Sequence, residues 1–139
     1  MTREEFDNYL VSIGGLIRTY RADKGPIVDS RYLGVDEGWL PLIKEMIDEL
    51  LAAGWDKRVH QSKEKFGGLR FYFDFIDDRI PEGEEGHIVD VDQITWNTAY
   101  SEIHKLEAES FYVCEDCGDP GERYAKGGWI RTLCKAHQK

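Results

Sequence analysis

Hydrophobic and polar positions alternate in the second half of the stretch from Arg58 to Phe75, RVHQSKEKFGGLRFYFDF. Its second arm places large apolar side chains at every second position: Leu69, Phe71, Phe73 and Phe75. This is the pattern of a strand that buries one face. The arm before the glycines has Val59 as its only aliphatic residue. We therefore predict two strands that turn at Gly67-Gly68, the first of them either a charged edge strand or a strand that binds something.

Two segments that flank this hairpin have the spacing of amphipathic helices. The stripe within residues 38–53 consists of Trp39, Leu42, Ile43, Met46, Ile47, Leu50 and Leu51. Pro41 lies in its first turn, where a missing amide is tolerated, and Gly54 follows its last residue. Residues 92–111 predict another helix, with a stripe formed by Trp96, Ala99, Tyr100, Ile103 and Leu106.

The N-terminus predicts a third and weaker helix. Thr2 and Glu5 have the spacing of a capping box. Apolar residues then recur at helical spacing: Phe6, Leu10, Ile13 and Ile17. Each glycine of Gly14-Gly15 costs a helix about 1 kcal/mol relative to alanine, so we expect the helix to end or kink there. Residues 21–35 predict an irregular connection.

Together these elements predict an α+β fold, with a small antiparallel sheet packed against two or three helices. The length of 139 residues fits one domain with a small appended module. We expect residues 1–112 to form the body and residues 113–139 to form a knuckle packed on it. Residues 77–92 are rich in Asp and Glu and predict an exposed acidic loop. A solvated insertion explains that loop, and a decoy or partner surface is the alternative.

Charge narrows the class of partner. The net charge is −9, which argues against a general nucleic-acid or membrane-surface binder, because both normally present net positive charge. No apolar run approaches transmembrane length, and the N-terminus lacks the apolar core of a signal peptide. We therefore expect a cytoplasmic protein with no membrane partner.

All three cysteines lie near the C-terminus in the pattern CxxC…CxxH, formed by Cys114, Cys117, Cys134 and His137. Zn²⁺ takes four Cys or His ligands in a tetrahedron, and two ligands three residues apart can reach one ion from a tight turn. Four protein ligands leave no open coordination position, so the sequence predicts a structural rather than a hydrolytic Zn²⁺. The alternative is three buried free thiols and an incidental histidine.

The remainder of the C-terminus fits such a module. Gly118 suits the positive φ that the turn after the second cysteine often needs. Gly127-Gly128 predicts a short hairpin whose second arm is 129–133. Three thiolates with one Zn²⁺ leave one net negative charge, and four nearby cations are expected to offset it: Arg123, Lys126, Arg131 and Lys135.

The longer hairpin carries the densest basic cluster of the chain: Lys57, Arg58, His60, Lys63, Lys65 and Arg70. In a regular strand, one face would carry Val59, Gln61 and Lys63. The other face would carry Arg58, His60 and Ser62.

From this cluster we predict a site for a small anionic ligand, such as a phosphate or a nucleotide. Cations and glycine amides would bind the phosphate, and an aromatic ring would stack. The predicted ligand-binding residues are Gln61, Lys63, Lys65, Phe66, Gly67, Gly68, Arg70 and Tyr72. The alternative is purely structural, because lysines protect an edge strand and a Gly-Gly turn needs no ligand.

Three blocks of this sequence resemble a family of small proteins encoded in bacteriophage and prophage genomes, usually recorded only as hypothetical. The blocks are DEGW at 36–39, SKEKFGGLRFYF at 62–73, and CEDCGDPG…GWIRTLCKAH within 114–137. The similarity spans residues 35–139 without the acidic loop. It implies a viral or prophage setting, hence the host cytoplasm, and a treble-clef-like zinc knuckle. It implies no known activity or ligand.

An enzyme is the class that the sequence supports least. No cysteine is left over as a nucleophile, and His60, His87 and His104 lack a recognisable Ser or Cys partner motif. Glu102 and His104 are two residues apart, which points them away from each other on a helix. We therefore expect a non-enzymatic protein.

Two functional hypotheses follow. In the first, the basic hairpin captures a small anionic ligand, such as a nucleotide immune signal of the host, as a counter-defence protein would. In the second, an acidic surface binds or inhibits a host protein, and imitation of nucleic acid is one way in which it could do so. Direct nucleic-acid binding through the knuckle is disfavoured by the net charge. The oligomeric state is open and includes a homo-oligomer.

Overall fold

The computed structural model describes residues 1–18, 24–73 and 93–138, with the side chains of 93–96 left out. The α-helices are α1 (Arg3–Ser12), α2 (Leu40–Ala52) and α3 (Gln93–Glu109). The strands are β1 (Ile17–Arg18), β2 (Arg58–Lys65), β3 (Gly68–Phe73), β4 (Glu122–Lys126) and β5 (Trp129–Leu133). Short 3₁₀ turns are η2 (Ser30–Leu33), η3 (Glu37–Trp39), η4 (Ser110–Tyr112) and η5 (Lys135–His137).

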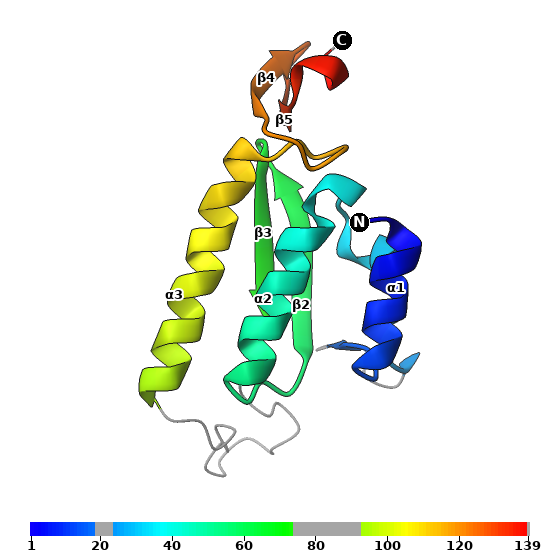
Figure 1. Ribbon diagram of the computed structural model, residues 1–139, viewed down its shortest axis with the longest axis vertical. Helices are drawn as coiled ribbons and strands as arrows, with labels where there is room; N and C mark the ends of the chain where they lie inside the picture. The colour runs from blue at the N-terminus through cyan, green and yellow to red at the C-terminus, as the bar shows by residue number, and fades with distance from the viewer. Residues whose placement is uncertain (19–23, 74–92, 139) are drawn as a thin grey trace.

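The strands form two separate sheets. One has the order β1-β2-β3, parallel between β1 and β2 and antiparallel between β2 and β3. The other is the antiparallel β4–β5 hairpin. Figure 1 shows this second hairpin beyond the turn end of the first, next to the C-terminus. The α+β prediction is confirmed, whereas the short parallel strand β1 was not predicted.

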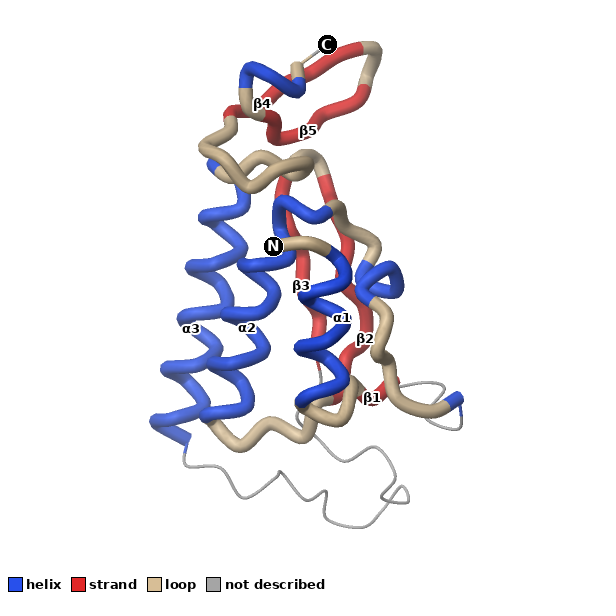
Figure 2. Tube along the Cα trace, turned by 45° about the vertical axis from the view of Figure 1, so that its right-hand side comes forward, coloured by secondary structure: helices blue, strands red, loops and turns tan. Residues whose placement is uncertain are grey.

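Helix α2 forms the centre of the core because one of its faces is entirely apolar. Its buried side chains are Leu40, Leu42, Ile43, Met46, Ile47 and Leu50. Figures 1 and 2 show α2 packed beside β2 and β3, with α3 on one side and α1 on the other. Burial of one such side chain contributes about 1.5–3 kcal/mol. The predicted helix over 38–53 is therefore present as η3 followed by α2.

Helix α1 has the predicted start and an early end. The Thr2 side chain accepts from the Glu5 amide at 3.1 Å, and the Glu5 carboxylate accepts from the Thr2 amide at 3.2 Å. This confirms the capping box. The helix ends at the C-cap Ile13, before the Gly-Gly pair. Ile17 was expected on the helix, but it lies in β1 opposite Arg58, because the chain reverses at the glycines.

Helix α3 closes the free edge of β3. The Leu69 amide donates to Ser110 Oγ at 2.8 Å, and the Phe71 amide donates to Glu107 Oε2 at 3.0 Å. Both acceptor side chains are buried. Side-chain acceptors therefore satisfy amides that a further strand would otherwise pair, which protects the edge from association.

Several predictions lie outside the described residues. They concern the acidic loop 77–92, the end of the strand at Phe75, His87 and the side chain of Trp96. Among the helices that the structure describes, none combines the length and the apolar character needed to cross a membrane.

Candidate metal centre and ligand groove

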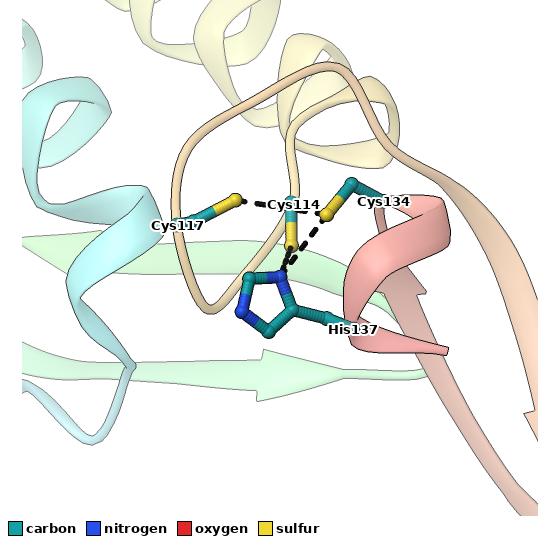
Figure 3. A group of neighbouring side chains, drawn as sticks. All are labelled: Cys114, Cys117, Cys134 and His137. Carbon is teal, nitrogen blue, oxygen red and sulfur yellow. Dashed lines mark hydrogen bonds between the residues drawn. The ribbon is translucent and has the colours of Figure 1, made fainter. Parts of the chain in front are cut away.

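The four predicted metal ligands come together at the C-terminal end (Figure 3): Cys114, Cys117, Cys134 and His137. Their ligand atoms all lie within 4.8 Å of one another. His137 Nδ1 lies 3.8 Å from Cys114 Sγ and 3.0 Å from Cys134 Sγ, and the Cys117 and Cys134 sulfurs are 3.7 Å apart. Metal–sulfur bonds of about 2.3 Å place tetrahedral sulfurs about 3.8 Å apart. The cluster therefore has the size of a tetrahedral metal site.

Local structure places the two ligand pairs. The first pair lies in a tight turn, in which the Gly118 amide donates to the Cys114 carbonyl at 2.9 Å and Gly118 has the predicted positive φ of 84°. In the second pair, Cys134 directly follows β5 and His137 lies in η5. The order of knuckle, hairpin and short helix agrees with the treble-clef-like arrangement that the resemblance implies, with the helix reduced to one 3₁₀ turn.

The thiols have different proton affinities. Burial raises the pKa of Cys114, but hydrogen bonds from surrounding backbone amides outweigh it, and the pKa falls below the ordinary thiol value. The Asp119 amide lowers the pKa of Cys117, but desolvation and contacts with the other two thiols raise it to about 11. A metal ion must therefore displace protons from this cluster, which makes metal binding dependent on pH.

The DEGW block docks the knuckle on the body. The Gly38 amide donates to the Glu115 carbonyl at 2.8 Å, and the Trp39 indole donates to the Val113 carbonyl at 2.9 Å. A Cβ on Gly38 would overlap with the Cys114 carbonyl oxygen. Only glycine permits this approach of two backbones.

Arg131 connects the same two regions by charge. Its guanidinium lies 3.0 Å from Asp36, 2.7 Å from Asp116 and 3.6 Å from Glu115. Burial raises the pKa of Glu115 to about 6, although the Thr132 amide and Arg131 oppose the shift. Arg131 was expected to offset the negative metal cluster. It is instead engaged by three carboxylates at the joint between knuckle and body.

The Gly-Gly block of the longer hairpin has a different role from the one predicted. The turn residues are Phe66 and Gly67, with φ of 52° and 84°, rather than Gly67 and Gly68. The Gly67 amide donates to Glu64 Oε1 at 2.6 Å, and its carbonyl accepts from Thr132 Oγ1 at 2.5 Å. The prediction of a free Gly67 amide for an anion is therefore wrong.

Gly68 is also packed closely against a neighbouring side chain. A Cβ at this position would overlap with the ring of Phe111. Both glycines are buried, whereas Lys65 and Phe66 are exposed at the tip. The glycines allow the turn to lie between Phe111 and the β5 strand of the knuckle, and they do not form a concave anion site.

The predicted faces of the first strand need correction because β2 contains an irregularity. The pairing register shifts between Val59 and Gln61. Val59 lies opposite Phe73, and Ser62 lies opposite Phe71. Val59 and Ser62 therefore share the core face, although they were expected on opposite faces.

After the shift, polar residues of the two strands share the other face. Gln61 lies opposite Tyr72, and Lys63 lies opposite Arg70. The Lys63 ammonium lies 5.8 Å from the centre of the Tyr72 ring, within reach of a cation–π contact. Four of the eight predicted ligand residues are thus neighbours on one face of the hairpin.

A groove of about 450 Å³ runs along the β3 edge towards α3. Its lining residues from the sheet include Gln61, Arg70 and Tyr72 of the predicted site, together with His60. Helix α3 contributes Tyr100, Ile103, His104 and Glu107. This volume lies in the range of small-molecule sites. Lys65, Phe66 and the two glycines do not line it.

The α3 residues of this groove were missed by sequence reasoning. His104 Nδ1 lies 3.3 Å from Glu107 Oε1, so the partner of His104 is three residues away rather than the Glu102 that was considered. Spacing of three residues places side chains on one helix face, and this signal was available in the sequence.

Comparison with models of protein families, with curated proteins and with solved structures found no match for this chain. The resemblance to bacteriophage proteins therefore stays a prediction.

Proposed function

We propose that this protein is a non-enzymatic binding protein in which a structural Zn²⁺ fastens the knuckle and the β3–α3 groove holds a small anionic ligand, of the nucleotide class. The ligand function is supported mainly by the position and the charge environment of Arg70. It lines the groove, and within the described part of the chain it forms no ion pair with a carboxylate. A half-buried cation that is not paired with a carboxylate favours an anionic ligand.

The choice of Zn²⁺ rests on the donor set of the metal centre. Three thiolates and one imidazole suit Zn²⁺ better than Mg²⁺ or Ca²⁺, which prefer oxygen ligands. Four protein ligands close the coordination sphere and favour a structural role. The bound ion would stabilise a module in which every residue of β4 except Tyr124 is exposed.

Metal analysis of the purified protein tests this assignment. We expect about one Zn²⁺ per chain by mass spectrometry of metals, and its loss in Cys134→Ser. Lys135→Ala is the matched control, because it changes the next residue without removing a donor. A chain that folds as described but contains no metal after supply of Zn²⁺ would contradict the proposal.

The ligand class follows from the chemistry of the groove walls. Arg70 offers a fork of donors to a phosphate, and the rings of Tyr72 and Tyr100 offer flat surfaces to a base. Lys63 adds a second cation on the same hairpin face. The resemblance to bacteriophage proteins extends the proposal to an immune-signal nucleotide that is sequestered without turnover.

Thermal shift against a panel of linear and cyclic nucleotides tests ligand capture. We expect at least one nucleotide to raise the melting temperature, and the rise to disappear in Arg70→Ala. Lys65→Ala is the control, because Lys65 lies on the same hairpin but does not line the groove. Absence of any shift across the panel, or an equal loss in both variants, would contradict the proposal.

A second function is favoured by the exposed aromatic residues of the knuckle end. Trp129 is 78% exposed and Tyr112 is 73% exposed. Trp129 lines two hollows, of about 380 and 390 Å³. Exposed Trp and Tyr are typical anchors of protein interfaces, which fits an interaction protein that binds a host partner. In that case Trp129→Ala would abolish recovery of the partner, while Arg70→Ala would not.

A further inference from the structure

The groove that contains Arg70 is also lined by a carboxylate and an imidazole of α3, Glu107 and His104. Glu107 is only 8% exposed, and its Oε2 accepts from the Phe71 amide at 3.0 Å. Its Oε1 lies 3.3 Å from His104 Nδ1. The carboxylate is thus fixed by the sheet edge and in turn fixes the imidazole.

The orientation of His104 leaves one ring nitrogen for a ligand. Its ring meets the Tyr100 ring edge-on, with centroids 4.5 Å apart, which restricts rotation. Because Nδ1 faces the carboxylate, Nδ1 carries a proton and Nε2 is the nitrogen available to the groove. The His104 side chain is 58% exposed, so a ligand can reach it.

We infer that His104, oriented by Glu107, is the second cationic contact of an anionic group held by Arg70, and that binding in this groove takes up a proton. This inference rests on the proposed ligand function of the groove. A neutral Nε2 presents a lone pair and repels an anion, whereas the imidazolium donates a hydrogen bond to it. The bound anion therefore favours the protonated ring.

Other charged or titratable groups line the same groove as His104. From the sheet these are the cation Arg70, the phenol Tyr72 and a second imidazole, His60. From α3 they are Glu107 and the phenol Tyr100. His60 is the other imidazole among the lining residues of this groove, and it supplies the matched control.

The same walls define which anion fits. Apolar side chains of Phe71, Phe73 and Ile103 line the groove between its polar groups. A ligand with a compact anionic head and a planar ring can place the head at Arg70 and His104 and the ring along these side chains. A phosphate ester of a nucleoside has this chemistry, and Arg70 with His104⁺ would balance two charges on its phosphate.

Sulfate tests the anion subsite separately from the base, because its charge is constant between about pH 6 and pH 8, where imidazoles titrate. The protein is titrated with sodium sulfate, and a parallel titration with sodium chloride of equal ionic strength is the control. The histidine ring signals are followed by NMR. We expect sulfate to bind about tenfold more tightly at about pH 6 than at about pH 8. We also expect sulfate to move the midpoint of the His104 titration to higher pH. In His104→Gln the pH dependence disappears, whereas His60→Gln retains it.

The outcomes separate this inference from the ligand function. Sulfate binding that is equally tight at both pH values, or pH dependence that survives in His104→Gln, would overturn the role of His104 and leave the nucleotide panel to decide the ligand function. Sulfate that leaves the His104 signal unchanged at both pH values would overturn it as well. Melting curves of each variant establish that it folds, and Glu107→Gln, which keeps an acceptor for the Phe71 amide, should reduce the pH dependence in a folded protein.

Discussion

The chain contains two hairpins with a Gly-Gly pair, and the pairs do different things. At the β2–β3 turn, Gly67 and Gly68 are buried against the knuckle and Phe111. At the β4–β5 turn, a Cβ on Gly127 or Gly128 would meet nothing within 4 Å. The first pair is needed for close packing between two modules. The second only turns the chain, and it presents Trp129 to solvent.

We expect the largest loss of stability when the metal ion that fastens the knuckle is removed. Chelation of the metal, or Cys134→Ser, should lower the free energy of unfolding by about 4 kcal/mol or more, because the folded knuckle loses a tight ligand. Calorimetry with and without chelator measures this. Acidification should release the ion as well, since protons compete for thiols such as Cys117, whose pKa without metal is about 11. Equal stability with and without metal would contradict the role of the ion.

Substitution of Gly38 is the next largest effect. Gly38→Ala places a methyl group against the Cys114 carbonyl, which belongs to the backbone and cannot rotate away. We expect a loss of about 3 kcal/mol, at the upper end of the range for overpacking. Chemical denaturation measures the loss. Gly25→Ala is a control at a glycine with open space around it, where only the backbone penalty applies.

Gly68→Ala should lower the free energy of unfolding by less than Gly38→Ala does, and a second substitution should compensate for part of the loss. The added methyl group meets a side chain, the ring of Phe111, so we expect a loss of about 1–3 kcal/mol. Phe111→Ala creates room for it, and the double variant should be more stable than the sum of the two single losses predicts. Additive losses in this double-mutant cycle would mean that the two residues do not pack against each other.

The smallest effect is expected at the other Gly-Gly pair. Gly127 has a φ of 59° and open surroundings, and asparagine tolerates this left-handed conformation. Gly127→Asn should therefore change the free energy of unfolding by no more than about 0.5 kcal/mol. A loss as large as that of Gly68→Ala would remove the distinction between the two turns.

The sequence predicted the elements whose evidence is local. The stripe of α2, the capping box of α1 and the four clustered Cys and His residues all follow from spacing along the chain. Contacts between modules were not visible in this way. Gly67 and Gly68 looked like a ligand turn because nothing in their neighbourhood indicates that Phe111 and Thr132 pack against them.

Strand register was the other source of error. The shift between Val59 and Gln61 changes which side chains share a face, and a regular alternation cannot anticipate it. It brings Lys63 beside Arg70 and Tyr72, so the anion hypothesis moves from the turn to the sheet edge rather than disappearing. The His104–Glu107 pair shows that helix spacing could have extended the site to α3.

Amide hydrogen exchange with and without metal tests most directly whether the β2–β3 turn is a docking surface for a metal-fastened knuckle. Removal of the metal should increase exchange at Gly38, whose amide donates to the Glu115 carbonyl of the knuckle. Exchange at Gly67 should increase as well, because its amide donates to Glu64 within a turn whose carbonyl would lose its bond to Thr132 of the knuckle. Exchange within α2 should stay slow, because its amides bond within the helix and its core face is buried. Unchanged exchange at Gly38 and Gly67 after complete metal removal would contradict the account.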